Sequence, residues 1–180
     1  MMIDASLGRA GCCGFPACPP QPPFPSPDSP LFPPPAGMNG PSALNIQLAT
    51  AQPAVANGAV IPMGAAVRQY GDNLSYDAAN HAVIVNRPGI YAFTWQMLVS
   101  AAVTDAVVTL QSLDGAVVLA QSGVPVGADA PVLLTGSAVA RLMPGTSWVL
   151  VNNSGSAVSL GVAGTAPAAF AASETVTELR

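Results

Sequence analysis

The stretch Asn86-Arg87-Pro88-Gly89-Ile90-Tyr91-Ala92-Phe93-Thr94-Trp95-Gln96-Met97-Leu98-Val99-Ser100 decides the fold class of this chain. Pro88-Gly89 is a strong turn signal, and the residues after it alternate between large apolar and smaller side chains. At a period of two, one face carries Tyr91, Phe93, Trp95, Met97 and Val99. The opposite face carries Ile90, Ala92, Thr94, Gln96 and Leu98, which are smaller and partly polar. The stretch therefore predicts a long β-strand over 90–100 with one buried face.

The chain from about Asn45 onward repeats this pattern in shorter runs, separated by turn residues about every 8 to 12 positions, which is typical of a β-sandwich. Asp114-Gly115 predicts a two-residue hairpin loop, and a helix over 163–172 is disfavoured because Pro167 interrupts it. We expect an all-β jelly-roll β-sandwich of about ten strands over residues 44–180. The expected strands are 45–50, 66–70, 74–77, 82–85, 90–100, 106–113, 116–121, 132–142, 148–152, 157–162 and 173–179, with 59–62 as a further edge segment.

Residues 1–43 have a different composition and predict a disordered leader. Most of the 19 prolines lie between Pro16 and Pro35, a density that excludes helix and sheet and favours extended polyproline II. All three cysteines, Cys12, Cys13 and Cys18, lie near the start of the leader, ahead of the dense proline segment that begins at Pro19. We interpret the leader as an anchoring or cross-linking arm. An odd number of thiols on such an arm suggests intermolecular disulfides or thiol attachment. A metal site and idle reduced thiols remain alternatives.

The composition excludes several classes of partner. Charged residues make up 8% of the chain, with 5 Lys+Arg against 9 Asp+Glu, and every basic residue is an arginine. Such a chain cannot neutralise a run of phosphates, so we expect no nucleic-acid binding. Apolar runs are broken well before the roughly 20 residues a bilayer needs, so we expect no membrane insertion. The first residues also lack the pattern of a signal peptide. A surface this poor in charge suits a protein packed against copies of itself.

Catalytic chemistry has few candidates in the sequence. His81 is the single histidine, and no Gly-x-Ser-x-Gly motif accompanies it, so we expect no enzyme, no cofactor and no metal site. Asn73-Leu74-Ser75 and Asn152-Asn153-Ser154 match the N-glycosylation pattern, although such triplets arise by chance. The aromatic residues Tyr91, Phe93, Trp95 and Trp148 are interpreted as core or trimer interface. A stacking platform for sugars is the alternative for Tyr91, Phe93 and Trp95.

Three segments together resemble the C-terminal domain of the collagen-like exosporium glycoproteins (BclA type), itself similar to the tumour-necrosis-factor and complement jelly rolls. They are Asn86–Thr94, with Pro88-Gly89-Ile90-Tyr91-Ala92-Phe93; Leu150–Leu160, with Asn152-Asn153-Ser154-Gly155; and the last strand, Glu174–Arg180. The resemblance covers roughly residues 44–180. The chain departs from that family at its front end, where a short Pro-rich, Cys-bearing leader stands in place of a collagen repeat.

The resemblance implies a homotrimer of compact jelly rolls without catalytic function. We therefore expect a structural subunit of a bacterial spore exosporium or surface filament, located on the spore surface or outside the cell. Its partners would be copies of itself and, through the leader, other spore-coat or filament proteins. The alternative is a receptor- or glycan-binding module of the same trimeric fold.

Overall fold

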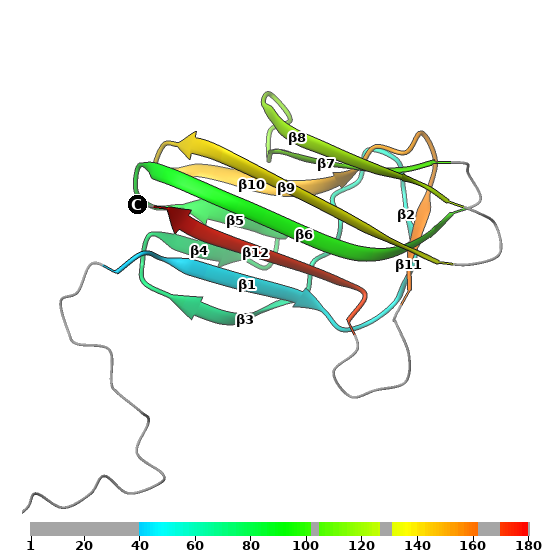
Figure 1. The fold of residues 1–180 in the computed structure, drawn as a ribbon, viewed down its shortest axis with the longest axis horizontal. Coiled ribbons are helices and arrows are strands. Elements are labelled where there is room, and N and C mark those ends of the chain that lie inside the picture. Colours follow the sequence, from blue (N-terminus) through cyan, green and yellow to red (C-terminus); the bar gives the residue numbers. More distant parts are fainter. Residues whose placement is uncertain (1–39, 102–104, 127–130, 162–169, 180) are drawn as a thin grey trace, which may run out of the picture. The chain divides into compact units, whose positions relative to one another are not determined.

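A computed structural model describes residues 40–101, 105–126, 131–161 and 170–179. Its regular structure is entirely β-strand, which confirms the predicted all-β class (Figure 1). Within this part of the chain, no helix could cross a bilayer. The strands are β1 (Ala43–Leu48), β2 (Gln52–Val55), β3 (Ala65–Tyr70), β4 (Leu74–Asp77), β5 (Ala82–Val85), β6 (Gly89–Ala101), β7 (Asp105–Ser112), β8 (Val118–Pro125), β9 (Val132–Leu142), β10 (Thr146–Asn152), β11 (Val158–Leu160) and β12 (Ala172–Leu179).

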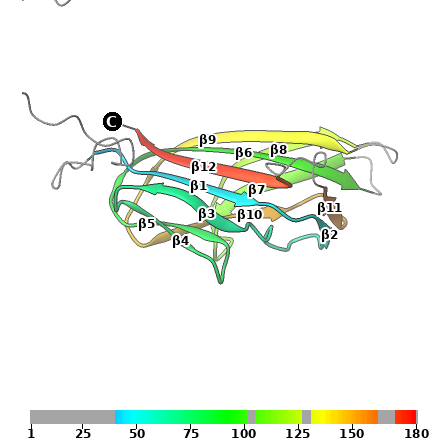
Figure 2. The same ribbon diagram turned by 90° about the horizontal axis from the view of Figure 1, so that it is seen from below.

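The strands form two antiparallel sheets packed face to face, the arrangement predicted as a jelly roll. One sheet has seven strands in the order β2-β11-β6-β12-β1-β3, with β9 paired to the other edge of β6, and the second has five in the order β4-β5-β10-β7-β8. Figure 2 shows the two layers edge-on, with β12 and β6 in one and β5 and β10 in the other. Strands distant in sequence are neighbours, since β6 pairs with both β12 and β9 along most of its length.

The core lies between the sheets and follows the alternation read from the sequence. Tyr91, Phe93, Trp95, Met97 and Val99 of β6 are all buried and join one cluster with residues of the five-stranded sheet such as Leu110 and Leu150. Large apolar side chains at every second position bury a continuous surface, and this burial is the main stabilising term of the domain. The predicted period of two is therefore correct for β6.

The Pro88-Gly89 turn is held by the first aromatic residue of β6. The Tyr91 hydroxyl donates a hydrogen bond to the carbonyl oxygen of Arg87 at 2.8 Å. Gly89 lies against the same ring, because a Cβ at this position would be 3.2 Å from Cε2 of Tyr91. The Pro-Gly-x-Tyr sequence thus closes a corner in which the tyrosine ring fills the space a larger residue 89 would need.

The structure corrects three details of the predicted strands. The Asp114-Gly115 loop spans five residues rather than two, because Gln111 pairs with Val118 and the Ser112 amide donates to the Val117 carbonyl. The sequence analysis missed β2, a four-residue edge strand that contains Pro53. The expected strand at 59–62 is a single bridge between Val60 and Val151. The described residues accordingly form twelve strands rather than about ten.

The predicted leader, residues 1–43, lies outside the described residues except for its last four. β1 begins at Ala43, one residue ahead of the expected start of the domain. The disfavoured helix over 163–172 also falls largely outside the described residues, and β12 begins within its last positions.

A candidate self-association face

The outward side of four neighbouring strands of the seven-stranded sheet carries little charge, although Arg68 of the adjoining edge strand β3 pairs with Asn45 at their border. We call the outer face the outward-pointing residues of the four neighbouring strands β1, β12, β6 and β9. Arg141, at one end of β9, is the one charged residue of this set. The set comprises Ala43, Asn45, Gln47, Ile90, Ala92, Thr94, Gln96, Leu98, Ser100, Leu133, Thr135, Ser137, Val139, Arg141, Ser173, Thr175, Thr177 and Leu179.

The strand register arranges this face in rows of small polar side chains. Across β1, β12, β6 and β9, one row reads Asn45, Thr175, Thr94 and Ser137, and the next reads Gln47, Ser173, Gln96 and Thr135. The Asn45 amide donates to the Thr175 hydroxyl at 2.8 Å. Apolar side chains surround these rows, with Ile90 48% exposed, Leu133 53% and Val139 66%. The face therefore combines an uncharged polar centre with an apolar surround.

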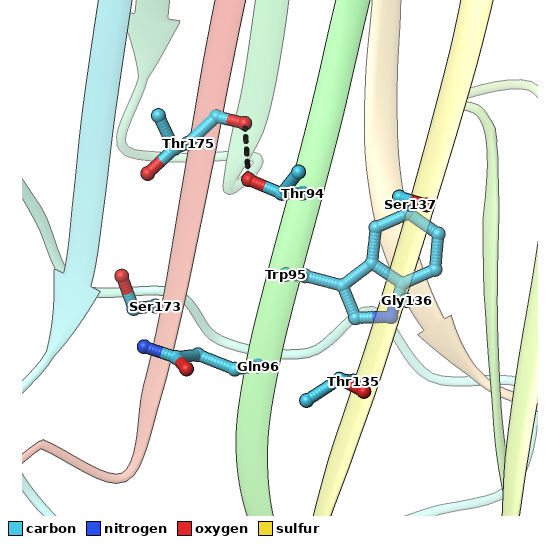
Figure 3. A pocket seen from close by; sticks show the side chains of 8 residues that line it. All are labelled: Thr94, Trp95, Gln96, Thr135, Gly136, Ser137, Ser173 and Thr175. Atoms are coloured by element: carbon cyan, nitrogen blue, oxygen red, sulfur yellow. Dashed lines mark hydrogen bonds between the residues drawn. The ribbon is translucent and has the colours of Figure 1, made fainter.

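A shallow hollow of about 560 Å³ lies at the centre of this face, over β12, β6 and β9 (Figure 3). Its lining consists of hydroxyl, amide and glycine residues and one indole, with no titratable group: Thr94, Trp95, Gln96, Thr135, Gly136, Ser137, Ser173 and Thr175. The buried centres of protein interfaces are depleted in charged residues, and the lining of this hollow has the same character.

Beneath the hollow, β9 carries a glycine opposite a tryptophan. Gly136 pairs with Trp95 of β6, and a Cβ built on Gly136 would lie 2.2 Å from Cζ2 of the indole. The ring occupies the space on the inner side of Gly136, where its Nε1 donates to the Ser122 hydroxyl of β8 at 3.0 Å. The indole thus fills the core beneath the hollow.

The aromatic residues singled out from the sequence all lie inside the sandwich. Tyr91 and Phe93 are 0% exposed, Trp95 is 2% and Trp148 is 4%. The Trp148 indole donates its hydrogen bond to Thr146 of the same strand. All four side chains are therefore core residues. None of them is exposed enough to stack against a sugar. Cys12, Cys13 and Cys18 lie outside the described residues.

His81 has a structural position in the turn between β4 and β5. Its backbone is in the left-handed region, with φ 53°, which is uncommon for a residue other than glycine. Its Nδ1 lies 2.7 Å from the Met63 carbonyl oxygen, which also accepts a hydrogen bond from the Tyr76 hydroxyl at 2.9 Å. His81 and Tyr76 together fasten the segment that precedes β3 to the β4–β5 hairpin.

Two turn carboxylates are occupied by local hydrogen bonds. Donation from the Asn80 side chain and the Ala79 amide lowers the pKa of Asp77, and donation from the Ser112 hydroxyl and the Ala116 amide lowers the pKa of Asp114. Among the described residues, no three His, Cys, Asp or Glu side chains are grouped so as to hold a metal. These acidic residues serve as turn formers.

Sequence reasoning missed the outer face and one buried carboxyl. The smaller, partly polar side of β6 was visible in the sequence, but its alignment with the threonines and serines of β12 and β9 needs the register. Glu174 is buried in the core, two positions from Val176 on the same side of β12. The even spacing of Glu174 and the apolar Val176 in the sequence was the available signal that Glu174 points inward. Asn152, which matches the N-glycosylation pattern, is fully buried and hence out of reach in the folded domain.

This double sheet defines a jelly roll of the kind found in tumour-necrosis-factor and complement domains. A crystal structure of murine APRIL at pH 8.0 has a TM-score of 0.59 at 14% identity, over 78% of this chain and 100% of that chain. Eiger TNF from S. frugiperda has a TM-score of 0.58 at 15% identity, over 78% and 94%. The globular domain of zebrafish complement 1qA has a TM-score of 0.53 at 12% identity, over 76% and 94%. At these identities the likeness concerns the fold. No family model and no curated protein sequence matches the chain.

Proposed function

We propose that the chain is a non-catalytic structural subunit whose jelly rolls associate through the outer face into a homotrimer. The observation that carries the proposal is the charge distribution of that face. A sheet with one face in water normally alternates apolar inward and polar or charged outward residues. Here the outward positions of four strands hold a single charge, at one end of β9, and an apolar surround.

A closed ring suits this face better than an open chain of subunits. Most soluble homo-oligomers have closed cyclic symmetry, and closure prevents uncontrolled growth. The threefold ring is the form implied by the resemblance to the BclA-type domains. Following that resemblance, the assembled subunit belongs to a spore exosporium or a surface filament, at the spore surface or outside the cell.

Assembly explains the face better than the alternative role as a glycan- or receptor-binding module. Stacking on aromatic rings is a principal way in which proteins hold planar or amphipathic ligands. The one aromatic residue at the hollow, Trp95, is 2% exposed and its Nε1 is already bonded to Ser122. A broad surface over several strands, poor in charge and only shallowly hollowed, matches a second protein surface better than a small ligand.

A charge placed at the centre of the outer face should dissociate the assembly. Thr94→Arg puts one guanidinium on each copy, and burying these groups without partners costs several kcal/mol per ion. We expect at least a 100-fold weaker association, measured as the native mass by light scattering after chromatography under reducing conditions.

Gln121→Arg is the matched control for this variant. Gln121 is an exposed polar residue of β8 in the five-stranded sheet, so the same arginine there should leave the native mass unchanged. Assembly that survives Thr94→Arg, or that both variants abolish equally, would refute the proposed interface.

The leader is proposed to link trimers to one another or to a coat layer through Cys12, Cys13 and Cys18. Without reductant, the full chain should form species larger than the chain on denaturing gels, and these should collapse when reductant is added. The Cys12/Cys13/Cys18→Ser variant should lack them. Identical bands with and without reductant would exclude disulfide linkage by the leader.

A further inference from the structure

Glu174 is a carboxylic acid in the middle of the seven-stranded sheet with its side chain in the core. Its strand, β12, lies between β1 and β6, and Glu174 pairs with Ile46 on one side and Trp95 on the other. The side chain is 2% exposed, and its Oε1 has no hydrogen-bond partner among the described residues. A buried charge in such a place is costly unless it is paired, so the carboxyl group prefers its neutral form.

Among the described residues, none offers this carboxyl group a positive charge. The chain contains no lysine, and Arg68, Arg87 and Arg141 are all exposed. Burial alone accordingly raises the pKa of Glu174, from 4.5 to about 8.

The ionisable groups that face Glu174 are few. The neighbouring strands contribute Ile46 from β1 and Trp95 from β6, neither of which titrates. The five-stranded sheet contributes Tyr76 of β4. Burial, together with the nearby charges of Glu174 and Asp77, raises the pKa of the Tyr76 phenol to about 12. His81 lies behind Tyr76, with 3.5 Å between Nδ1 and the hydroxyl oxygen. Tyr76 is therefore neutral over the range in which Glu174 titrates.

We propose that Glu174 is a pH-sensitive element of the fold, protonated in the folded domain at neutral pH and destabilising the seven-stranded sheet once it ionises. Ionisation transfers the carboxyl proton to solvent and leaves an unpaired carboxylate between Ile46 and Trp95, under the hollow of the outer face. The contribution of Glu174 to the stability of the domain is consequently complete in acid and is lost toward alkaline pH. The effect belongs to the single domain and holds whether or not the chains associate.

The sign follows from the two states of the carboxyl group. Below pH 4.5 both the folded and the unfolded chain keep the proton, so Glu174 adds no pH dependence. Between pH 4.5 and about 8 the unfolded chain has released it and the folded chain has not, so stability falls as pH rises. Above about pH 8 both states are ionised and the loss is complete.

The test compares Tm from pH 5 to 9 in the full chain and in Glu174→Gln, with reductant present. Glutamine has the shape of the protonated acid and does not titrate, so the wild-type Tm should fall by on the order of 10 °C more than the variant's. Asp105→Asn, which removes an exposed carboxylate at the start of β7, should keep the wild-type slope.

A second measurement reports the proton itself. At pH 7 the infrared spectrum of the wild type should contain the carbonyl stretch of a protonated carboxyl group, and this band should be missing from Glu174→Gln. Parallel Tm slopes in wild type and Glu174→Gln, together with no such band, would overturn the proposal. Failure of self-association would appear instead in the native mass of each sample and would leave the Tm comparison intact.

Discussion

Gly136→Ala is expected to destabilise the domain by about 3 kcal/mol or more, although the change adds one methyl group. The new Cβ would lie 2.2 Å from Cζ2 of Trp95 and 2.6 Å from the Ser122 hydroxyl oxygen. The indole is enclosed by the core and held through its hydrogen bond to Ser122, so it has no free space to enter. Urea unfolding followed by circular dichroism measures the loss.

Gly123→Ala is the matched control in the neighbouring strand β8. Its nearest atoms would be 3.4 Å from the new Cβ, an ordinary contact, so this variant should be neutral or slightly more stable. The steric origin is tested further by a double-mutant cycle. Trp95→Leu removes the obstacle, so Gly136→Ala should cost much less in that background. Equal costs in both backgrounds would show that the indole is not the cause.

Asn152→Leu is expected to cost roughly 3–5 kcal/mol, because it breaks a hydrogen-bond network that is complete in the folded domain. The Asn152 Nδ2 donates to the carbonyl oxygens of Val55 and Ser156, each at 2.8 Å. Its Oδ1 accepts from the amide and the hydroxyl of Ser154, at 3.0 and 2.6 Å. Leucine would leave the Val55 carbonyl and the Ser154 amide without these partners and would weaken the link between β2 and the β10–β11 loop.

Asn153→Leu provides the comparison, since Asn153 is the next residue and is exposed. Its main-chain amide donates to the Val107 carbonyl, a bond that the substitution preserves. We expect a change within about 0.5 kcal/mol for this variant. If the two leucine variants unfold at the same urea concentration, the network around Asn152 does not carry the stability assigned to it.

The sequence predicted those parts of the fold whose signal is local. The alternation of Tyr91, Phe93 and Trp95 after Pro88-Gly89 identified the central strand and its buried face, and the structure agrees. β2 escaped prediction because four residues containing Pro53 carry no periodic signal. The loop after β7 was placed correctly but made too short, because Ser112 and Asp114 close it with side-chain hydrogen bonds that a two-residue turn does not need.

The candidate site depends on contacts between residues far apart in sequence. Thr94, Thr175 and Ser137 are unremarkable in their own strands and become one uncharged surface only through the register of β12, β6 and β9. Glu174 looks like a surface residue in a terminal strand. It lies inside because it is on the same side of β12 as Val176, two positions later, which points into the core. The charge-poor composition indicated self-association but not which face provides it.

Sedimentation equilibrium of the full chain in reductant, from low micromolar concentration upward, tests most directly whether the outer face holds copies of the domain together. A single species with three times the mass of one chain is the predicted result. A monomer across the whole concentration range would contradict the account, since the uncharged outer face would then be solvated and unpartnered.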